Sequence, residues 1–555
     1  MKIKLDKKLL LIFVLALLLR VYKLGQFPEG FHVDEVKVGW NAYSILKTGL
    51  DDRGNKLTLY YNSFGDFRPT GIFYLTIPSI IIFGLNEFAV RFPSALIGAL
   101  TVFPLYFLTK EFARGKTKKD DKTPSLAAII SALLLALNPW HISTSRATSE
   151  VIISTFFSLS GLFLFLKGLN QKKTKPIIAA CILLAISYFF YHSIRLLAPM
   201  FLFTIIAFYW RSLKPNLKKC SVFGLLFISL FTLILISDKE ARGRFSQVSI
   251  FSDLDVQYEL SRMPFEEGPN KVFIARLFHN KPLVYARRFV NEYAKYFSSN
   301  FFLVSTEAKP ARYQTIGVGL LTYIELTLFI FGLIAIAQKK FSVLPLLLLL
   351  VSPFAAALTT EDSPNLHRAM LMLPFVMVIS SYGVVGLRIF SKKYLEKILY
   401  TILALLTLNF VFFIHMYFVH NRVHIPLYRN VGAKELALYL NEVKDNYDQI
   451  IITNIPDDPY PWIAFFTKSD PKTFNQSAIL RSEGVWAYKN LTFTGQRCPS
   501  RDAFTIPRNE KLLVVDAEAC AKESKLHDRS DVKLVKTIFR PDDSEVYTLW
   551  SNVID

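Results

Sequence analysis

Two adjacent acids, Asp34 and Glu35, follow the first long apolar segment and open a run from Val36 to Leu46 with apolar residues at helical spacing. This spacing predicts a helix that lies along an apolar boundary. Acids at a helix start often serve only as caps. An acid at such a boundary is also partly desolvated, which makes it a stronger proton acceptor. Asp34 and Glu35 are therefore candidate catalytic residues.

A second set of polar residues lies between the later apolar segments. The candidate substrate-binding residues are Asp66, Arg68, Arg146, Glu150, His192, Arg195, Arg242, Arg244, His367 and Arg368. Each has a simpler explanation on its own: Asp66 fits a helix cap, and Arg146 and Glu150 fit an i,i+4 ion pair. An arginine near a helix end can also reach lipid headgroups. Together, guanidinium groups opposite two acidic clusters indicate a site that binds a phosphate at the membrane and deprotonates a nucleophile.

The composition indicates that these residues belong to a membrane protein. The chain has 555 residues, of which 52% are hydrophobic and 20% charged, with 49 Phe, and its mean hydropathy is +0.32. Repeated long apolar segments identify a polytopic membrane protein and exclude a cytosolic enzyme, a disordered scaffold and a disulfide-rich secreted module. The net charge of +21 is explained by cytoplasmic loops, so we expect a lipid bilayer as partner and no nucleic acid.

The apolar segments predict about eleven membrane-spanning helices. They lie near 8–24, 91–112, 125–139, 149–168, 176–190, 196–211, 220–237, 315–337, 341–358, 369–389 and 396–418. Every second loop is basic, which places the N-terminus in the cytoplasm and the tail outside. This pattern requires that the short stretch 71–85 does not cross. We therefore expect an integral protein of the plasma (inner) membrane, retained by its first apolar segment, with a first outer loop at 25–90 and a long one at 238–314.

The polar tail predicts a second domain. We expect an all-α membrane domain over residues 1–425, with surface helices in its first outer loop, and a small soluble α/β domain on the outer side over 426–555. Helical spacing at 432–446 and 462–466 alternates with β-rich runs at 449–453, 511–516 and 546–550. Cys498 and Cys520 lie in this tail, and they could form a disulfide if it faces an oxidising compartment.

Several local motifs resemble those of the GT-C membrane glycosyltransferases, in particular the protein O-mannosyltransferases and the aminoarabinose transferases that modify lipid A. The similar parts are Asp34-Glu35, Asn41-Ala-Tyr43, Gly49, Arg68-Pro69, the segment from Phe83 to Ser94, Asn138-Pro139 and Ser145-Arg146. The resemblance covers residues 8–200 well and the later spans loosely. Two departures are visible: Asp66-Phe67-Arg68-Pro69 replaces a Glu-Lys-Pro run, and Glu150 stands where an Asp is usual.

The resemblance implies a donor sugar linked to a polyprenyl phosphate, an acceptor hydroxyl on a protein, lipid or glycan, and transfer on the outer face with inversion. Asp34 matches the family's general base, and Glu35 matches an acid that positions the base or the acceptor. Arg195 and Arg368, with Arg242 or Arg244, would stabilise the departing phosphate. A divalent metal is compatible with this chemistry, but no ligand set indicates one. Two other classes remain open, a lipid-linked-sugar transporter or flippase and a non-catalytic membrane assembly factor.

Overall fold

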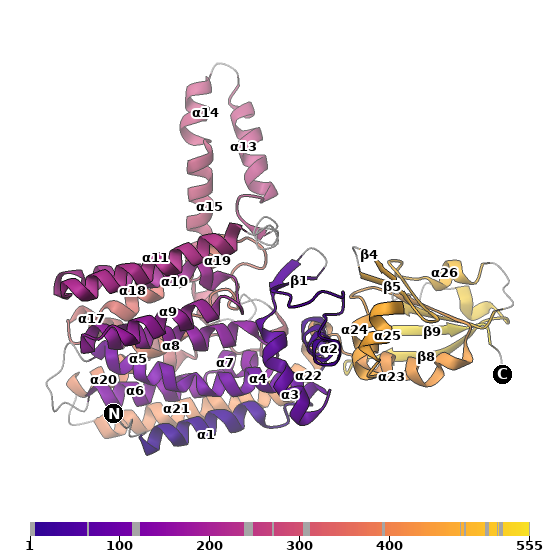
Figure 1. Ribbon diagram of the computed structural model, residues 1–555, viewed down its shortest axis with the longest axis horizontal. Coiled ribbons are helices and arrows are strands. Elements are labelled where there is room, and N and C mark those ends of the chain that lie inside the picture. Colours follow the sequence, from indigo (N-terminus) through magenta and orange to yellow (C-terminus); the bar gives the residue numbers. More distant parts are fainter. Residues whose placement is uncertain are drawn as a thin grey trace.

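The chain forms a bundle of long helices with a sheet domain at one end (Figure 1). The structure is a computed structural model, and it describes residues 6–553 except 64–65, 114–122, 238–247, 269–270, 304–310, 391–394, 478, 482–483, 506–509, 519 and 521–524. Arg242 and Arg244 therefore lie outside the described residues. The N-terminus lies at the end of the bundle far from the sheet domain.

Apolar helices that lie side by side make up the bundle. They are α1 (Lys7–Val21), α4 (Glu87–Leu100), α5 (Val102–Ala113), α6 (Thr123–Leu137), α7 (Pro139–Arg146), α8 (Glu150–Gln171), α9 (Lys175–Ser187), α10 (Ser193–Tyr209), α11 (Pro215–Ser237), α17 (Tyr323–Ala337), α18 (Leu344–Val351), α19 (Phe354–Ala357), α20 (Met372–Phe390) and α21 (Leu395–His415). Among the described residues, five helices are long and apolar enough to cross a membrane, or six if α6 and α7 form one bent span. Because other apolar helices are shorter, the total of eleven spans stays a prediction.

Residues 140–148, which separate two of the predicted spans, lie mostly in helix α7, bent by 55° from α6. The bend falls at Asn138-Pro139, because proline cannot continue the hydrogen-bond ladder of α6 but fits the first turn of a new helix. The Asn138 side chain caps α7 by accepting from the His141 amide at 3.0 Å. The predicted helix 315–337 also begins later, at Tyr323, where Thr322 and Glu325 form a capping box.

The predicted first outer loop contains two helices. They are α2 (Val33–Thr48) and α3 (Gly71–Phe83), with a hairpin of β1 (Tyr60–Ser63) and β2 (Asp66–Pro69) between them. Figure 1 places them between the bundle and the sheet domain. The α3 helix has 13 residues, shorter than the roughly 20 that a span requires. Its Gly71 amide donates to the Phe189 carbonyl at 3.0 Å, which ties α3 to the start of the α9–α10 turn.

The tail folds as an α/β domain around a seven-stranded sheet of order β4-β5-β6-β3-β7-β9-β8. Its strands are β3 (Gln449–Thr453), β4 (Ile479–Arg481), β5 (Gly484–Tyr488), β6 (Leu491–Thr494), β7 (Leu512–Ala517), β8 (Lys533–Phe539) and β9 (Glu545–Ser551). Its helices are α23 (Ala433–Val443), α24 (Tyr460–Phe466), α25 (Pro471–Ser477) and α26 (Ser500–Ala503). All three predicted strands and both predicted helices are present.

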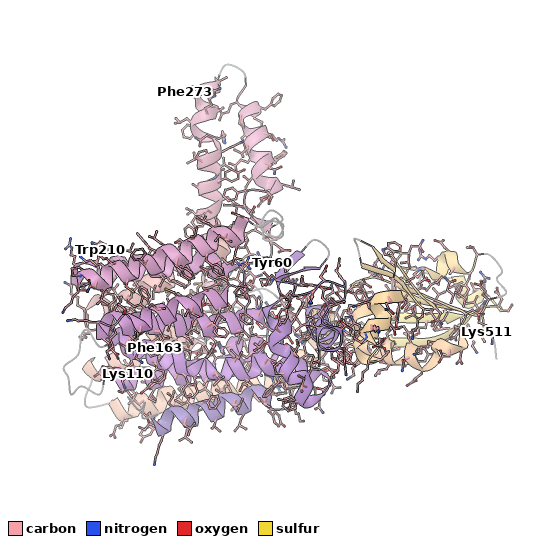
Figure 2. The ribbon with its side chains drawn as sticks, in the orientation of Figure 1. Tyr60, Lys110, Phe163, Trp210, Phe273 and Lys511 are labelled. Atoms are coloured by element: carbon pink, nitrogen blue, oxygen red, sulfur yellow. A yellow bond between two sulfur atoms is a disulfide. The ribbon has the colours of Figure 1, made fainter. Side chains whose placement is uncertain are left out.

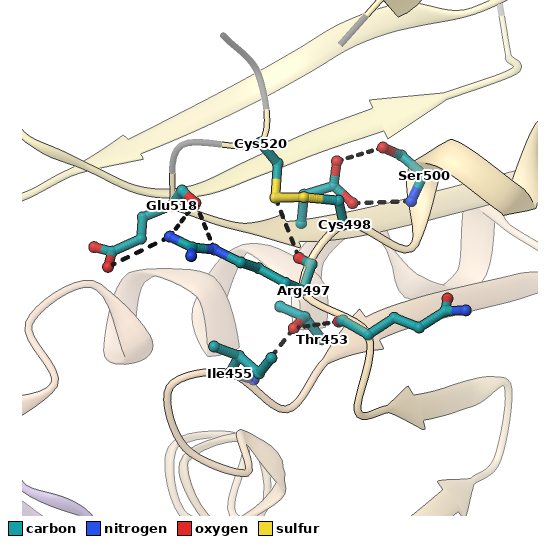
Figure 3. The surroundings of a disulfide bond; sticks show 9 residues. Thr453, Ile455, Arg497, Cys498, Ser500, Glu518 and Cys520 are labelled. Atoms are coloured by element: carbon teal, nitrogen blue, oxygen red, sulfur yellow. Dashed lines mark hydrogen bonds and ion pairs between the residues drawn. A yellow bond between two sulfur atoms is a disulfide. The ribbon is translucent and has the colours of Figure 1, made fainter. Parts of the chain in front are cut away.

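A disulfide joins Cys498 to Cys520 in this domain (Figure 3). Beside it, the Ser500 amide donates to the Asp516 carboxylate at 2.9 Å. The pairing is the one that an oxidising compartment would allow.

The sheet domain docks on α2 through its helix α24. The Trp462 indole N–H donates to the Phe31 carbonyl at 2.7 Å, and the ring of Phe465 lies 2.6 Å from where a Cβ on Gly39 would stand. The phenol of Tyr460 donates to Asp52 at 3.1 Å. Only glycine at position 39 leaves room for this contact, so the tail braces the helix that carries Asp34 and Glu35.

Two helices of the bundle, α17 and α20, approach each other closely at glycines. A Cβ on Gly332 would lie 2.0 Å from the Ile379 carbonyl oxygen, whereas one on Gly386 would lie 3.4 Å from Ala335. Small residues at such crossings let helix backbones pack in a membrane.

We expect Gly332→Ala to destabilise the protein by about 1–3 kcal/mol, because the added methyl meets a backbone atom. Gly386→Ala is the matched control on the same helix pair, since it gains about 1 kcal/mol of helix propensity without a clash. Melting curves of the two purified variants in detergent check this difference. Equal melting temperatures for both variants would contradict the close crossing.

Candidate active site

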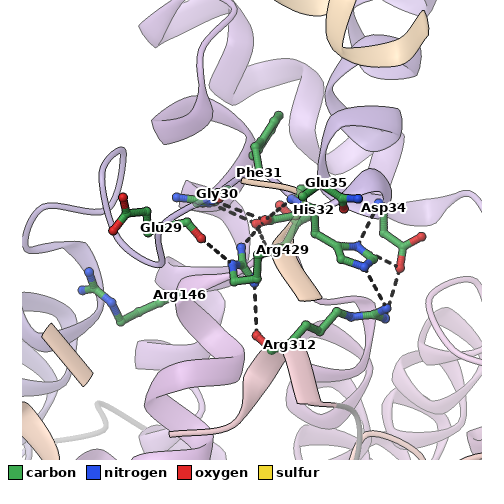
Figure 4. A network of polar contacts seen from close by, with 12 residues as sticks. Glu29, Gly30, Phe31, His32, Asp34, Glu35, Arg146, Arg312 and Arg429 are labelled. Carbon is green, nitrogen blue, oxygen red and sulfur yellow. Dashed lines mark hydrogen bonds and ion pairs between the residues drawn. The ribbon is translucent and has the colours of Figure 1, made fainter. Parts of the chain in front are cut away.

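Asp34 lies at the start of α2 between two arginines. Its carboxylate contacts Arg68 of β2 at 2.6 Å and Arg312 of the 3-10 turn η3 (Ala311–Tyr313) at 3.0 Å. Its backbone amide donates to Nδ1 of His32, the N-cap of the helix, at 3.1 Å. The side chain is 15% exposed. Asp34 therefore does not face bulk solvent, and guanidinium groups from two distant segments converge on it. Figure 4 shows the contact with Arg312.

The electrostatics of Asp34 favour the charged form. Burial would raise the pKa of this carboxyl, but Arg68 and Arg312 outweigh burial and hold its pKa well below its usual value. Burial and the nearby Arg312 lower the pKa of His32 to about 3. At neutral pH the site thus holds an ionised Asp34 beside a neutral His32.

Glu35 points into the protein and joins four chain segments. Its carboxylate contacts Arg91 of α4 at 3.0 Å and pairs closely with Arg429 of the 3-10 turn η5 (Pro426–Arg429). It also accepts from the amides of Thr148 at 3.0 Å and His32 at 3.2 Å. Burial opposes ionisation of Glu35, but the two arginines and these hydrogen bonds lower its pKa to about 2.

Arg429 connects Glu35 to the partner of Asp34. Besides Glu35, its guanidinium donates to the Glu29 carbonyl at 3.0 Å and to the Arg312 carbonyl at 3.2 Å. Figure 4 shows these contacts converging. One buried side chain thereby fixes both the acid pair and the turn that carries Arg312.

A cavity of about 600 Å³ is lined by both arginines that contact Asp34. Six of the predicted residues line it, namely Arg68, Glu150, His192, Arg195, His367 and Arg368. Arg312, which the sequence reading missed, lines it too. Because Arg68 and Arg312 also bind Asp34, they connect the carboxylate to the cavity. The same cavity has an apolar side, formed by Leu196, Ile236, Val248, Ala355 and Leu358.

Neighbouring groups hold the cationic side chains in place. The guanidinium of Arg195 lies 5.2 Å from the ring centroid of Tyr60 and contacts His192 at 3.0 Å. Arg368 pairs with Glu361 at 2.6 Å and donates to the Thr359 hydroxyl at 2.8 Å. The cavity therefore presents oriented donors that suit a phosphate.

His367 is set between aromatic rings. It stacks on Tyr313 with ring centroids 5.1 Å apart, and its Nε2 lies 3.1 Å from the Ser149 hydroxyl. Burial and the charge of Arg312 lower the pKa of His367 well below its usual value. It is therefore a neutral hydrogen-bonding group at this wall of the cavity.

The structure does not bring Arg146 to the cavity. Its guanidinium is buried and donates to the carbonyls of Leu19 at 2.9 Å and Tyr22 at 2.8 Å, where it caps the end of α1. The expected i,i+4 geometry with Glu150 does not arise, because α7 ends at Arg146 and α8 begins at Glu150. Asp66 begins strand β2, opposite Ser63, and its place in the site stays a prediction.

Two residues of the site, Arg312 and Arg429, have no signal in the sequence. Each is an arginine in a short 3-10 turn, outside the apolar periodicity and the motifs that identified the others. Only the tertiary fold brings these turns to α2.

A family model for dolichyl-phosphate-mannose-protein mannosyltransferases matches residues 68–236. An uncharacterized protein of Aquifex aeolicus is 30% identical over 175 residues, which are 30% of this chain and 31% of that protein. A putative mannosyltransferase, YycA of Bacillus subtilis, is 28% identical over 217 residues, 36% of this chain and 29% of the relative. The matches thus span about a third of each curated relative.

Among solved structures, ArnT from Cupriavidus metallidurans bound to undecaprenyl phosphate aligns over 98% of both chains with a TM-score of 0.51 and 13% identity. The oligosaccharyltransferase AglB from Archaeoglobus fulgidus aligns over 83% of this chain and 63% of its own, with a TM-score of 0.47 and 14% identity. The chain therefore shares the overall fold of ArnT. The predicted resemblance to membrane glycosyltransferases is confirmed by this fold and by the match of residues 68–236 to the mannosyltransferase family model.

We expect Glu35→Gln to destabilise the protein by about 3–5 kcal/mol, because it leaves Arg91 and Arg429 buried without a counter-charge. Glu361→Gln is the control, since it breaks an ion pair of a half-exposed acid that contributes about 1 kcal/mol or less. Melting temperatures in detergent measure both losses. A Glu35→Gln protein that melts like the wild type would show that this cluster does not hold the site together.

Proposed function

We propose that the protein is an integral membrane glycosyltransferase that moves a sugar from a polyprenyl phosphate to an acceptor hydroxyl on the outer face. The single observation that carries this proposal is the cavity that joins Asp34, through Arg68 and Arg312, to Arg195 and Arg368. Its apolar side matches the first isoprene units of a lipid, and its arginines match a phosphate. The Cys498–Cys520 disulfide supports an oxidising compartment for the tail.

The proposed reaction is a single displacement. The acceptor oxygen attacks C1 of the sugar, its proton passes to the Asp34 carboxylate, and the bond between C1 and the phosphate oxygen breaks. The electron pair leaves with the polyprenyl phosphate, whose growing charge Arg195 and Arg368 stabilise. The acceptor oxygen attacks C1 from the face opposite the phosphate, where Asp34 lies. The configuration at C1 is therefore inverted.

Glu35 has a positioning role in this proposal. Its carboxylate is bound by two arginines and two amides, so its oxygens are engaged within the protein. It fixes the first turn of α2 and thereby the direction of the Asp34 side chain. Among the described residues, no three His, Cys, Asp or Glu side chains cluster as metal ligands do, and the proposal assigns no step to a metal ion.

The arginines that hold Asp34 also couple its basicity to the donor. A phosphate in the cavity would attract Arg68 and Arg312, which both line it. Because those charges keep the pKa of Asp34 low, sharing them with a phosphate raises the pKa and makes Asp34 a better base. The base is thus strengthened when a donor is present.

Asp34→Asn should reduce sugar transfer by roughly 10²–10⁴-fold, the usual contribution of a general base. The assay reconstitutes the purified protein with a panel of polyprenyl-phosphate sugars and measures released carrier. The exposed Asp445→Asn is the control, and unchanged binding of polyprenyl phosphate would show that Asp34→Asn keeps its cavity. Full activity of Asp34→Asn, or no carrier release from any donor in the panel, would contradict the proposal.

The pH profile tests the coupling between donor and base. In the free enzyme the pKa of Asp34 lies well below its usual value of 3.8, so Asp34 stays ionised as pH falls, and kcat/KM should be flat between about pH 5 and 8. With donor bound the pKa rises, so the acidic limb of kcat should lie at higher pH than that of kcat/KM. The same acidic limb in both profiles would contradict donor coupling.

A further inference from the structure

A helical hairpin projects from the side of the bundle. It consists of α13 (Leu254–Glu266), α14 (Val272–Phe278) and α15 (Lys281–Lys295), here called the arm. Figure 1 shows the arm running crosswise to the long bundle helices. The preceding segment is fixed beside the cavity, where the Ile250 amide donates to the Leu358 carbonyl at 3.0 Å. If the bundle helices cross a membrane, the arm extends along the membrane plane.

Ion pairs hold the two sides of the arm together. Arg288 of α15 contacts Asp253 before α13 at 2.7 Å, and Arg287 pairs with Glu259 of α13. Near the tip, His279 lies 3.1 Å from Glu267. These three contacts join the two sides of the arm into a defined hairpin.

The outer surface of the arm is unusually apolar. Phe265 is 82% exposed and Phe273, near the far end of the arm in Figure 2, is 78% exposed. Other large apolar side chains on the arm are also exposed, namely Leu254, Tyr258, Met263, Val272, Ile274, Leu277, Phe278, Leu283 and Val290. Water is a poor solvent for so many exposed apolar side chains on one hairpin, and they mark a surface that contacts something apolar.

Cations accompany these apolar side chains. From 268 to 291 the chain has five basic residues and no acidic one. The basic residues are Lys271, Arg276, Lys281, Arg287 and Arg288. Arg287 and Arg288 pair with acids of the arm, so Lys271, Arg276 and Lys281 are the cations proposed to meet headgroups. Aromatic and aliphatic side chains combined with a basic surplus are typical of helices that lie in a bilayer interface and bind anionic headgroups.

The arm continues a surface that already suits lipid. It leaves the bundle next to α11 (Figure 1), and only 17% of the most apolar window of that helix is buried. Exposed apolar residues on α11 include Phe223, Phe227, Leu230, Leu233 and Ile236. The arm leaves the bundle beside α11 and runs crosswise to that helix. The lipid that surrounds α11 would therefore also surround the arm.

We propose that the arm lies within the bilayer interface, parallel to the membrane plane, with its apolar side chains among the acyl chains and its cations at anionic headgroups. This inference depends on the bundle spanning a membrane and not on the glycosyltransferase activity. The arm would anchor the end of the bundle that holds the cavity at one depth in the interface, beside the apolar wall of the cavity.

Spin labels placed in full-length protein measure this depth. In a Cys181→Ala, Cys220→Ala background that keeps the disulfide, single cysteines replace Leu254, Phe265 or Phe273, and Lys472 in the exposed part of the tail is the control. The protein is reconstituted in vesicles containing phosphatidylglycerol, and relaxation by oxygen is compared with relaxation by a water-soluble nickel chelate. Only variants that match the parent protein in gel-filtration volume and melting temperature are compared, because these have kept the fold.

The three arm labels should respond more to oxygen than to the chelate, and the Lys472 label should respond in the reverse order. Depths at 254 and 265 should agree within about 5 Å for an arm in the membrane plane, whereas an upright helix would separate them by about 16 Å. Arm labels that match the Lys472 label would overturn the proposal. Protection from both reagents would also overturn it, because a second copy or another protein would then cover the arm.

Discussion

The buried contact of Glu35 with Arg91 and Arg429 is the constraint on which the site depends. It joins the start of α2, the bundle and the start of the tail at one carboxylate. A buried ion pair of this kind contributes little net stability compared with apolar packing, because both charges lose their hydration. Its value lies in specificity: a chain that places α2 differently leaves three charges buried without partners. The same guanidinium of Arg429 holds the Arg312 carbonyl, so the backbone of the turn that carries one partner of Asp34 is fixed by the same contact.

Adjacent positions on one helix let the two acids differ in role. Successive residues on an α-helix point about 100° apart, so Asp34 faces the arginines at the cavity while Glu35 faces the interior. The sheet domain makes this orientation rigid, since α24 packs on α2 where Gly39 leaves room for Phe465. Loss of the Glu35 ion pairs, or of the packing of α24 on α2, would leave the Asp34-Glu35 motif intact but would no longer fix the directions of its two side chains. This explains how the proposed function can depend on a tail that does not contain any of the predicted site residues.

The sequence was informative wherever a local pattern determines structure. Apolar segments predicted most bundle helices, and the charged residues and histidines between them predicted six residues of the cavity wall. It failed where contacts are long-range. Arg312 and Arg429 lie in short turns without periodicity, and their partners are hundreds of residues away along the chain. The prediction for Arg146 was wrong for a different reason. Its spacing from Glu150 suggested an ion pair on one helix, but the helix is interrupted between α7 and α8, and Arg146 donates to carbonyls at the end of α1. Spacing predicts a shared face only within a continuous helix.

The charge balance of the cavity favours the product side of the proposed reaction. Arg68, Arg195, Arg312 and Arg368 share one small space, and carboxylates of Asp34 and Glu361 offset them in part. A sugar-linked phosphate is a diester with one negative charge, whereas the departing polyprenyl phosphate is a monoester with roughly −1.5 to −2 at neutral pH. Interactions that strengthen as charge develops lower the barrier, while those equal in both states only tighten binding. A cluster of arginines is therefore better matched to the leaving group than to the donor. The same preference slows release of the lipid phosphate. Asp34 must also lose the proton that it has accepted before Arg68 and Arg312 can pair with its carboxylate again.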